Sequence, residues 1–498
     1  MNKTYEALTS LLERTMALQT SLVLFEWDNE TLAPEDAGSY TATVIGALSE
    51  EYYRNMTGDE MGKAIEACEE EDGLQEVERA VVKAAKEARE ELICIPAKEY
   101  RENAQLVAEA GKVWSKAKKD EDFDSFAPTL EKVIGFRKKF ASYRRKEGQK
   151  LYDTMLDEFE KDFNEKLLDE FFNQLKTEIV PLLKEIMKSG KTIDDSFLTG
   201  GYPVDKQREM AEFLAEYVGF DFKKGVLSES AHPFTTNLHN HDVRITTSYH
   251  DKMDSSMFSV IHEAGHGLYE LGISDEITQT PVGQGTSMGM HESQSRFFEN
   301  IIGRNEAFWE PLYGKLTELY PDKLKDIPMK KFVEAINKVE PNFIRTEADE
   351  LTYSLHILIR YEMEKMIIEE DVDLKELPKI WADKYEEYLG VRPETFSEGI
   401  LQDIHWSQSS FGYFPSYALG NAFGAQLYYH MKKEMDFDEL LRTGKISVIR
   451  EYLREHVHKF GKLKTSREIL KDVTGEDFNP DYFIQYLKEK YRKLYELS

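Results

Sequence analysis

Two histidines four residues apart are the first feature of the sequence that could carry chemistry. They are His262 and His266 in DSSMFSVIHEAGHGLYELG, and Glu263 follows the first of them. Residues four apart share one face of an α-helix, so both imidazoles can reach one tetrahedral zinc ion. Glu263 would lie beside that ion, where its carboxylate can take a proton from an attacking water. The pattern, HExxH, is typical of metalloproteases.

A catalytic zinc also needs a third protein ligand, and Glu292 is the candidate. The histidine segment is a well-bounded helix, since Asp254 or Ser255 can cap its start and Gly272 can end it. The glycine-rich loop TPVGQGTSMGM then leads into HESQSRFFENIIG, where an apolar stripe predicts a second helix ending at Gly303. Glu292 stands near the start of that helix, with enough chain before it for a return to the metal. A lone glutamate on a helix is usually solvent-exposed, so that interpretation stays open.

Long helices are predicted on the N-terminal side of this site. Residues 1 to about 190 are rich in Glu, Lys, Ala and Leu and contain only four prolines. In LQEVERAVVKAAKEAREELICI, for example, Val77, Val81 and Ala84 recur three or four apart, with charged residues on the other face. Residues 1–190 are therefore expected to form a helical lobe.

The sequence changes character immediately before the histidine helix. Turn residues crowd between apolar positions from about Ile193 to Thr247, which indicates irregular structure and a little strand. In DVRITTSY, Val243, Ile245 and Thr247 alternate with other residues, as in a short, half-exposed strand. Helical character returns after it.

The expected architecture is therefore mostly α, with a small β element. No boundary is clean enough to divide the chain into independent domains. We expect residues 1–498 to form a single catalytic unit, in which 191–430 carry the active site and 431–498 form C-terminal helices.

The amino-acid composition disfavours some classes of binding partner. Lys and Arg number 64 against 93 Asp and Glu, which gives a formal charge of −29 and disfavours nucleic acid and anionic membranes. Only Cys68 and Cys94 are present, neither in a metal-binding spacing, which fits a reducing cytoplasm. Neither a signal peptide nor a membrane helix is evident, so we expect a soluble, cytoplasmic protein.

Several further segments stand in a fixed order along the chain. HEAGHGLYELG, TPVG and HESQSR are flanked by HPF, DVRIT, IRTEADELTY, GILQDIHW and GYFPSYALG, and WDNET stands near the N-terminus. In this order they resemble the M32 carboxypeptidases, the carboxypeptidase Taq family of metallopeptidases. The resemblance runs from about Tyr202 to Gln426.

The resemblance implies a neurolysin-like helical fold with a deep active-site groove. It implies a divalent metal, zinc or alternatively cobalt, with Glu292 as the third ligand. It further implies an enzyme that removes C-terminal amino acids from peptides, and commonly a homodimer.

The resemblance also suggests roles around the metal. Tyr413 and Tyr417, in GYFPSY, resemble tyrosines that donate a hydrogen bond to the developing oxyanion, and the choice between them stays open. His405 in QDIHW either faces the groove or is a satisfied core histidine. His232 and Phe234 of HPF would narrow the groove rather than take part in chemistry.

A free C-terminal carboxylate needs a cation, and a bidentate guanidinium is the usual solution. Arg345 in IRTEAD and Arg244 in DVRIT are the candidates. The alternative is that Arg345 only forms a structural ion pair with Glu347 or Asp349.

The groups behind the ligands are less clear. His291 is expected either to support the metal site or to contact substrate. Some HExxH enzymes place a carboxylate four residues after the ligand glutamate to orient a ligand histidine, but Arg296 occupies that position here. The orienting group is therefore left unassigned.

Two other functions remain open. An oligopeptidase or dipeptidyl carboxypeptidase could use the same helical zinc scaffold. A non-catalytic peptide-binding protein with a relic site is the remaining alternative, although such a protein would have no need to retain Glu263.

Overall fold

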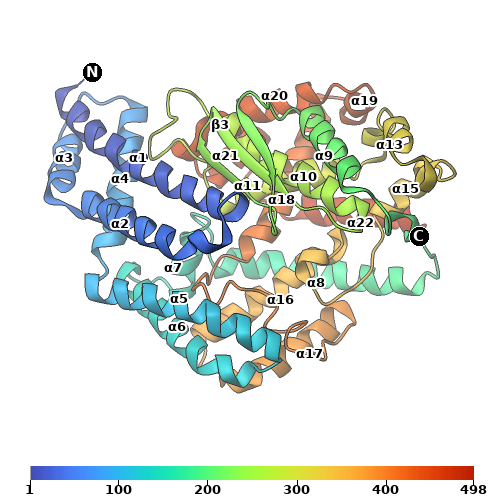
Figure 1. Ribbon diagram of the computed structural model, residues 1–498, viewed down its shortest axis with the longest axis horizontal. Coiled ribbons are helices and arrows are strands. Elements are labelled where there is room, and N and C mark those ends of the chain that lie inside the picture. Colours follow the sequence, from blue (N-terminus) through green and yellow to red (C-terminus); the bar gives the residue numbers. More distant parts are fainter. Residues whose placement is uncertain (1, 498) are drawn as a thin grey trace.

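The computed structural model describes residues 2–497 as a mostly helical molecule with one small sheet (Figure 1). This confirms the predicted fold class. The N-terminal helices are α1 (Lys3–Thr31), α2 (Gly38–Thr57), α3 (Asp59–Glu69), α4 (Glu76–Ile93), α5 (Ala97–Asp120), α6 (Phe123–Arg144), α7 (Leu151–Asp157), α8 (Glu165–Lys188) and α9 (Val204–Val218).

The sheet and the helices around it follow in the chain. The strands are β1 (Gly225–Glu229), β2 (Thr235–His239) and β3 (Asp242–Thr247), and the helices are α10 (Met253–Leu271), α11 (Met288–Arg296), the π-helical segment η3 (Phe297–Ile302), α12 (Glu306–Trp309), α13 (Tyr313–Leu319), α14 (Pro321–Leu324) and α15 (Met329–Ile336). The C-terminal helices are α16 (Glu350–Glu369), α17 (Leu377–Leu389), α18 (Pro415–Glu434), α19 (Phe437–Arg442), α20 (Ile446–His456), α21 (Ser466–Thr474) and α22 (Asp481–Tyr495).

The sheet has the order β1-β3-β2, with β1 parallel and β2 antiparallel to β3. The predicted strand in DVRITTSY is thus β3, the central strand. Val243 and Ile245 are fully buried, because they point towards the helical core. The sheet lies beside α10 and brings β2 close to the histidine helix (Figure 1).

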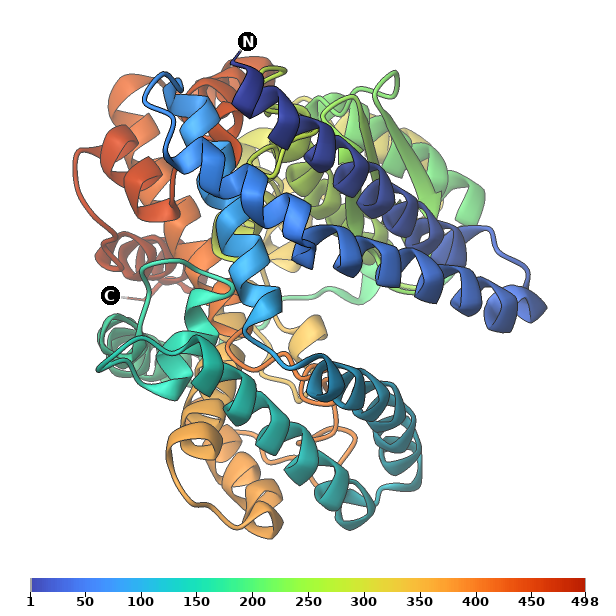
Figure 2. The same ribbon diagram turned by 90° about the vertical axis from the view of Figure 1, so that its left-hand side faces the viewer.

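Helices α1 to α4 enclose a hydrophobic core of their own, which includes Leu8, Ile65 and Val81 and is closed by Ile273 and Ile277 from the loop after α10. The larger core extends from α5 to α22. Figure 2 shows α1 and α2 along the upper part of the molecule, with α5, α6 and α17 below them. The predicted division of the chain at residues 190 and 430 stays a prediction.

Helix α10 begins slightly earlier than the sequence indicated. Its N-cap is Lys252, whose side chain makes no capping hydrogen bond, so neither Asp254 nor Ser255 is the cap. Asp254 instead lies inside the first turn, 3.5 Å from the Lys252 ammonium, where a negative charge is favoured by the helix dipole. Gly272 ends the helix as predicted.

Candidate metal centre

Helix α10 lies in the core and carries the two predicted histidine ligands. Most of its residues are buried, yet the side chains of His262 and His266 stay 17% exposed. Their rings lie 5.0 Å apart, as expected one helical turn apart. The pair therefore opens from the core towards solvent.

Glu292 comes from α11 and completes the set. Its Oε2 lies 3.6 Å from Nε2 of His262 and 3.5 Å from Nε2 of His266. Ligands about 2.1 Å from a tetrahedral ion would lie roughly 3.4 Å apart. These three donor atoms, from two imidazoles and one carboxylate, therefore fit one divalent metal ion.

Two glycines allow the helices to approach this closely. A Cβ at Gly265 of α10 would lie 2.7 Å from the carbonyl oxygen of Gln294, and one at Gly420 of α18 would lie 2.6 Å from the Cβ of Glu292. Both contacts are too short for a side chain. Helix α11 is therefore held tightly between α10 and α18.

Glu299 is the carboxylate that orients His262, and the sequence interpretation missed it. Its Oε2 accepts a hydrogen bond from Nδ1 of His262 at 2.9 Å, which leaves Nε2 for a metal. Arg296 lies between the two acids and donates to Glu292 at 2.7 Å and to Glu299 at 3.1 Å. Glu299 follows Glu292 by two turns and shares its face, so a search at this longer spacing would have found it.

The negative charges of Glu292 and Glu299 are compensated by the positive charge of Arg296. Burial opposes ionisation of Glu292 and Glu299, but the Arg296 guanidinium outweighs it and holds the pKa of both carboxyls well below the usual range. Burial also lowers the pKa of His262, but the charge of Glu292 and the hydrogen bond to Glu299 outweigh it and raise that pKa. Both acids are thus ready to act as anions at neutral pH.

His266 is supported by a second chain of hydrogen bonds. Its Nδ1 lies 2.7 Å from Nδ1 of His291, and Nε2 of His291 lies 2.7 Å from Oε1 of Glu270. Glu270 also accepts from Asn237 and from the backbone N–H of Gly285. His291 therefore lies directly behind one of the two predicted ligand histidines. Glu270 was not found from the sequence, although it lies four residues after His266.

The predicted general base, Glu263, is 7% exposed and points towards β2. The hydroxyl of Thr235 donates to its Oε2 at 2.5 Å. Burial raises the pKa of the Glu263 carboxyl, which moves it towards the range of a useful proton acceptor.

Tyr413, Tyr417 and His405 form a cluster at the start of α18. The two tyrosine rings lie 5.1 Å apart, and the Tyr417 hydroxyl lies 3.2 Å from Nε2 of His405. The Tyr413 hydroxyl has a weak contact of 3.9 Å with the sulfur of Met288, at the start of the helix that carries Glu292. Burial lowers the pKa of His405 to about 4, so this imidazole is neutral at pH 7.

Arg345 is buried, and its partner is neither Glu347 nor Asp349. Its Nε and Nη2 both contact Oδ1 of Asp403, at 3.0 and 2.9 Å. The other oxygen of Asp403 accepts from the fully buried Arg360 at 2.7 Å. Asp349 instead caps α16 through the backbone N–H of Thr352.

This cluster carries one carboxylate for two guanidinium groups, so a positive charge remains. Asp403 was missed because it lies far from both arginines in the sequence. Arg345 lies 4.9 Å from the Tyr417 ring, and its Nη1 contacts the Tyr353 hydroxyl at 3.3 Å. Tyr353 in turn stacks beneath Arg296, the partner of Glu292. Arg345 is thus connected to the metal centre through aromatic side chains.

Arg244 and Phe234 lie beside the N-terminal helix, and His232 is close to them in the sequence. The Arg244 guanidinium pairs with Asp242 at 2.9 Å and lies 5.6 Å from the ring of Trp27 in α1. Phe234 makes an edge contact with the same ring, and His232 is exposed. Arg244 and Phe234 thus join the sheet to α1 rather than contacting the three donor atoms.

The family follows from comparison with known proteins. A profile described as "Carboxypeptidase Taq (M32) metallopeptidase" matches residues 7–491. The chain belongs to the M32 family. Among M32 relatives, Carboxypeptidase 1 of Bacillus subtilis is 44% identical over 490 residues, covering 98% of each chain. Thermostable carboxypeptidase 1 of Pyrococcus furiosus is 36% identical over 501 residues, covering 98% of this chain and 99% of the relative.

Solved M32 structures agree with this assignment. The M32 carboxypeptidase from Deinococcus radiodurans superposes with a TM-score of 0.97 at 30% identity, and 99% of this chain and 100% of that chain are covered. Metallocarboxypeptidase 1 of Trypanosoma cruzi superposes with a TM-score of 0.94 at 32% identity, and 98% of this chain and 99% of that chain are covered. This M32 protein is a metal-dependent carboxypeptidase, which sets aside the oligopeptidase and non-catalytic alternatives.

Two other features lie outside the metal centre. Within residues 2–497 of this M32 chain, none of the helices has the length and apolar character needed to cross a membrane.

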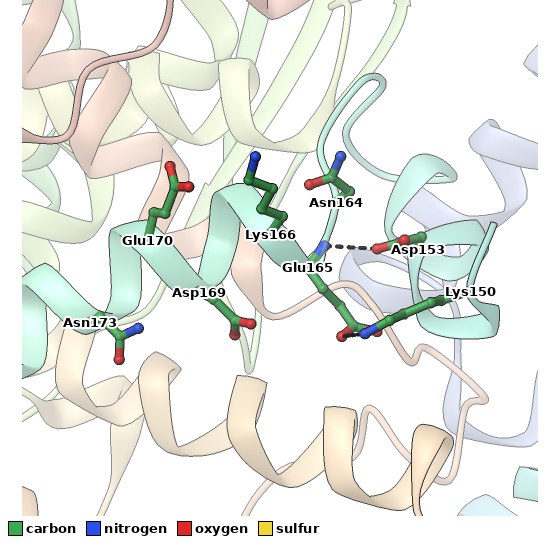
Figure 3. Close-up of a pocket in the computed structure, with 8 residues that line it drawn as sticks. All are labelled: Lys150, Asp153, Asn164, Glu165, Lys166, Asp169, Glu170 and Asn173. Atoms are coloured by element: carbon green, nitrogen blue, oxygen red, sulfur yellow. Dashed lines mark hydrogen bonds and ion pairs between the residues drawn. The ribbon is translucent and has the colours of Figure 1, made fainter. Parts of the chain in front are cut away.

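A polar hollow of about 390 Å³ lies between α7 and α8 (Figure 3). There Glu165 pairs with Lys150 at 2.6 Å, and its backbone N–H donates to Asp153. These contacts serve to join the two helices.

Proposed function

We propose that zinc is the working ion of this carboxypeptidase, with His262, His266 and Glu292 as its ligands. The observation that carries this proposal is the arrangement of three donor atoms at distances that fit a tetrahedral site. Two imidazoles and one carboxylate suit zinc, and they also accept cobalt. When bound, the ion would supply Lewis acidity and an activated water.

Glu263 is proposed as the general base. Its burial and the Thr235 hydrogen bond fix the carboxylate beside His262, and its raised pKa favours accepting a proton from the attacking water. The same carboxyl would then pass that proton to the leaving amine. Tyr413 or Tyr417 would donate a hydrogen bond to the oxygen of the scissile carbonyl, since a phenol donates without carrying charge. Tyr413 is the favoured donor, because its hydroxyl makes a weak contact with the sulfur of Met288, whereas the hydroxyl of Tyr417 faces His405.

Arg345 is proposed to bind the C-terminal carboxylate of the peptide. Two buried guanidinium groups share Asp403 alone, so a substrate carboxylate would balance the remaining positive charge. His405 stays neutral there and would orient Tyr417 through its Nε2. Arg244 is the less favoured candidate because Asp242 already occupies its guanidinium.

His232 and Phe234 are proposed to narrow the substrate groove. Their support is the contact between Phe234 and Trp27, which closes the space between β2 and α1. A cytoplasmic location and a homodimer remain proposals that come from the family resemblance and the composition.

Metal content and peptide digestion test the proposed function together. The purified protein should contain about one zinc per chain, and dialysis against a strong chelator should abolish release of C-terminal residues from a peptide ladder read by mass spectrometry. Zinc, or cobalt, should restore it. Undiminished hydrolysis by metal-free protein would contradict the proposal.

A further inference from the structure

A second pocket lies beside η3, the segment that follows the helix of Glu292, and none of the three proposed metal ligands lines it. Its volume is about 510 Å³, and its walls come from η3, α15, α18 and α22. Small-molecule sites commonly have volumes of about 300–1,000 Å³. The pocket is therefore large enough for a small organic ligand.

The lining is both charged and aromatic. Five basic and five acidic side chains line the pocket, together with Tyr428, Tyr429 and Tyr486 and the apolar Ile301, Val333 and Leu494. Because the positive and negative charges of the lining are balanced, the pocket does not attract a polyanion such as a nucleotide. This lining fits a small zwitterion that has an apolar side chain.

Charged side chains of the lining would hold the two ends of such a zwitterion. The cations Arg304 and Lys490 line the pocket, where a ligand carboxylate would compete for them with Glu299 and Glu350. Acidic side chains of the lining, such as Glu489, would pair with the ammonium group.

Two hydrogen-bond routes lead from this pocket to the catalytic side. Nη2 of Arg304 contacts Oε1 of Glu299 at 3.3 Å, and Glu299 holds His262. Asn300 also lines the pocket and contacts Asn421 at 3.3 Å, whose amide donates to the backbone carbonyl of Tyr417 at 3.0 Å. A ligand carboxylate that engages Arg304 would compete with Glu299 for the guanidinium.

We propose that this pocket binds a free α-amino acid, the kind of product that a carboxypeptidase releases, and that its occupancy changes turnover at the metal centre. This goes beyond the proposed peptidase function, because it assigns a second, non-catalytic site. The ammonium would meet acidic side chains of the lining such as Glu489, the carboxylate would meet Arg304 and Lys490, and an aromatic or aliphatic side chain would contact the tyrosines.

Calorimetric titration of the holoenzyme with L-phenylalanine tests the site. Two binding events per chain are expected, one in each site. Val333→Trp, which fills the pocket, should remove one event and keep basal hydrolysis, whereas Arg345→Ala should remove the other. L-Phenylalaninamide and N-acetyl-L-phenylalanine each lack one charge and should bind the pocket at least 10-fold more weakly.

A surface variant guards against a folding defect in Val333→Trp. Lys493→Glu reverses an exposed charge on the pocket rim and should weaken pocket binding at least 5-fold. Lys488→Glu, on the same helix but outside the pocket, should not. A wild type with a single event, or pocket variants that keep both events, would overturn the proposal.

Kinetics test the connection to the metal centre. In the wild type, saturating L-phenylalanine should change kcat at least 2-fold, whereas inhibition of Val333→Trp should be purely competitive. A pocket that binds the amino acid without any change in kcat would overturn the part of the proposal that concerns turnover.

Discussion

Glu299 and His262 are joined by a hydrogen bond of 2.9 Å between Oε2 and Nδ1, which turns Nε2 of the imidazole towards Glu292. We predict that Glu299→Gln lowers metal affinity about 10-fold to 100-fold, because it removes the charge that makes His262 a stronger ligand. Competition with a chelating dye would measure the affinity. The exposed Glu318→Gln serves as the control and should leave it unchanged.

Glu263 and Glu292 should separate into two phenotypes. Glu263→Gln is predicted to keep the metal and to lower kcat about 100-fold to 10,000-fold, because it removes the proton acceptor. Glu292→Ala should weaken metal binding itself. Metal analysis of both purified variants, with turnover measured at saturating metal, separates the roles, and near wild-type turnover of metal-loaded Glu263→Gln would exclude it as the base.

Arg345→Ala should remove the preference for a free C-terminus. Losing a buried guanidinium that faces a carboxylate costs about 2 to 5 kcal/mol of transition-state binding. kcat/KM should therefore fall strongly for free peptides, and the variant should discriminate little between free and amidated peptides. Arg244→Ala is the matched comparison. If Arg345→Ala keeps the wild-type ratio while Arg244→Ala loses it, the role belongs to Arg244.

The two tyrosines can be separated by removing single hydroxyl groups. Tyr413→Phe is predicted to lower kcat about 100-fold to 1,000-fold, the usual effect of losing an oxyanion donor. Tyr417→Phe should have the smaller effect on kcat, because its hydroxyl contacts His405. Steady-state kinetics on one peptide would measure both, and the reverse order would assign the donor to Tyr417.

Glu364 should make the protein less stable as pH rises. Its carboxylate accepts from Tyr152, Trp406 and the backbone N–H of Gly412, and burial raises its pKa from 4.5 to about 7. The folded state thus binds more protons than the unfolded state between these values, so the contribution of Glu364 is complete below about pH 4.5 and is lost as pH rises to about 7.

The neutral variant Glu364→Gln makes this measurable. The stability advantage of the wild type over the variant should shrink by up to about 1.4 kcal/mol per pH unit across that window. Urea unfolding at pH 5, 6 and 8 would measure it. An advantage that grows with pH would show that the carboxylate is stabilised as an anion in the folded protein.

The sequence was most informative where spacing along one helix determines geometry. The helical repeat alone was enough to predict that His262 and His266 share one face of a helix. The alternation of apolar residues with others was enough to predict the strand around Val243. Glu299 follows the same rule at a longer spacing and could have been found. Asp403 could not, because its pairing with Arg345 and Arg360 depends on how distant segments pack.

The close contact of Gly420 with Glu292 has a consequence for motion. Because the Cβ and Cγ of Glu292 pack directly against the backbone of Gly420, α11 and α18 cannot slide past each other without collision. Glu292 and the tyrosines at the start of α18 must then move together as one rigid unit. The distance between Glu292 and the start of α18 is therefore fixed by this pair of helices and does not depend on the elements around it.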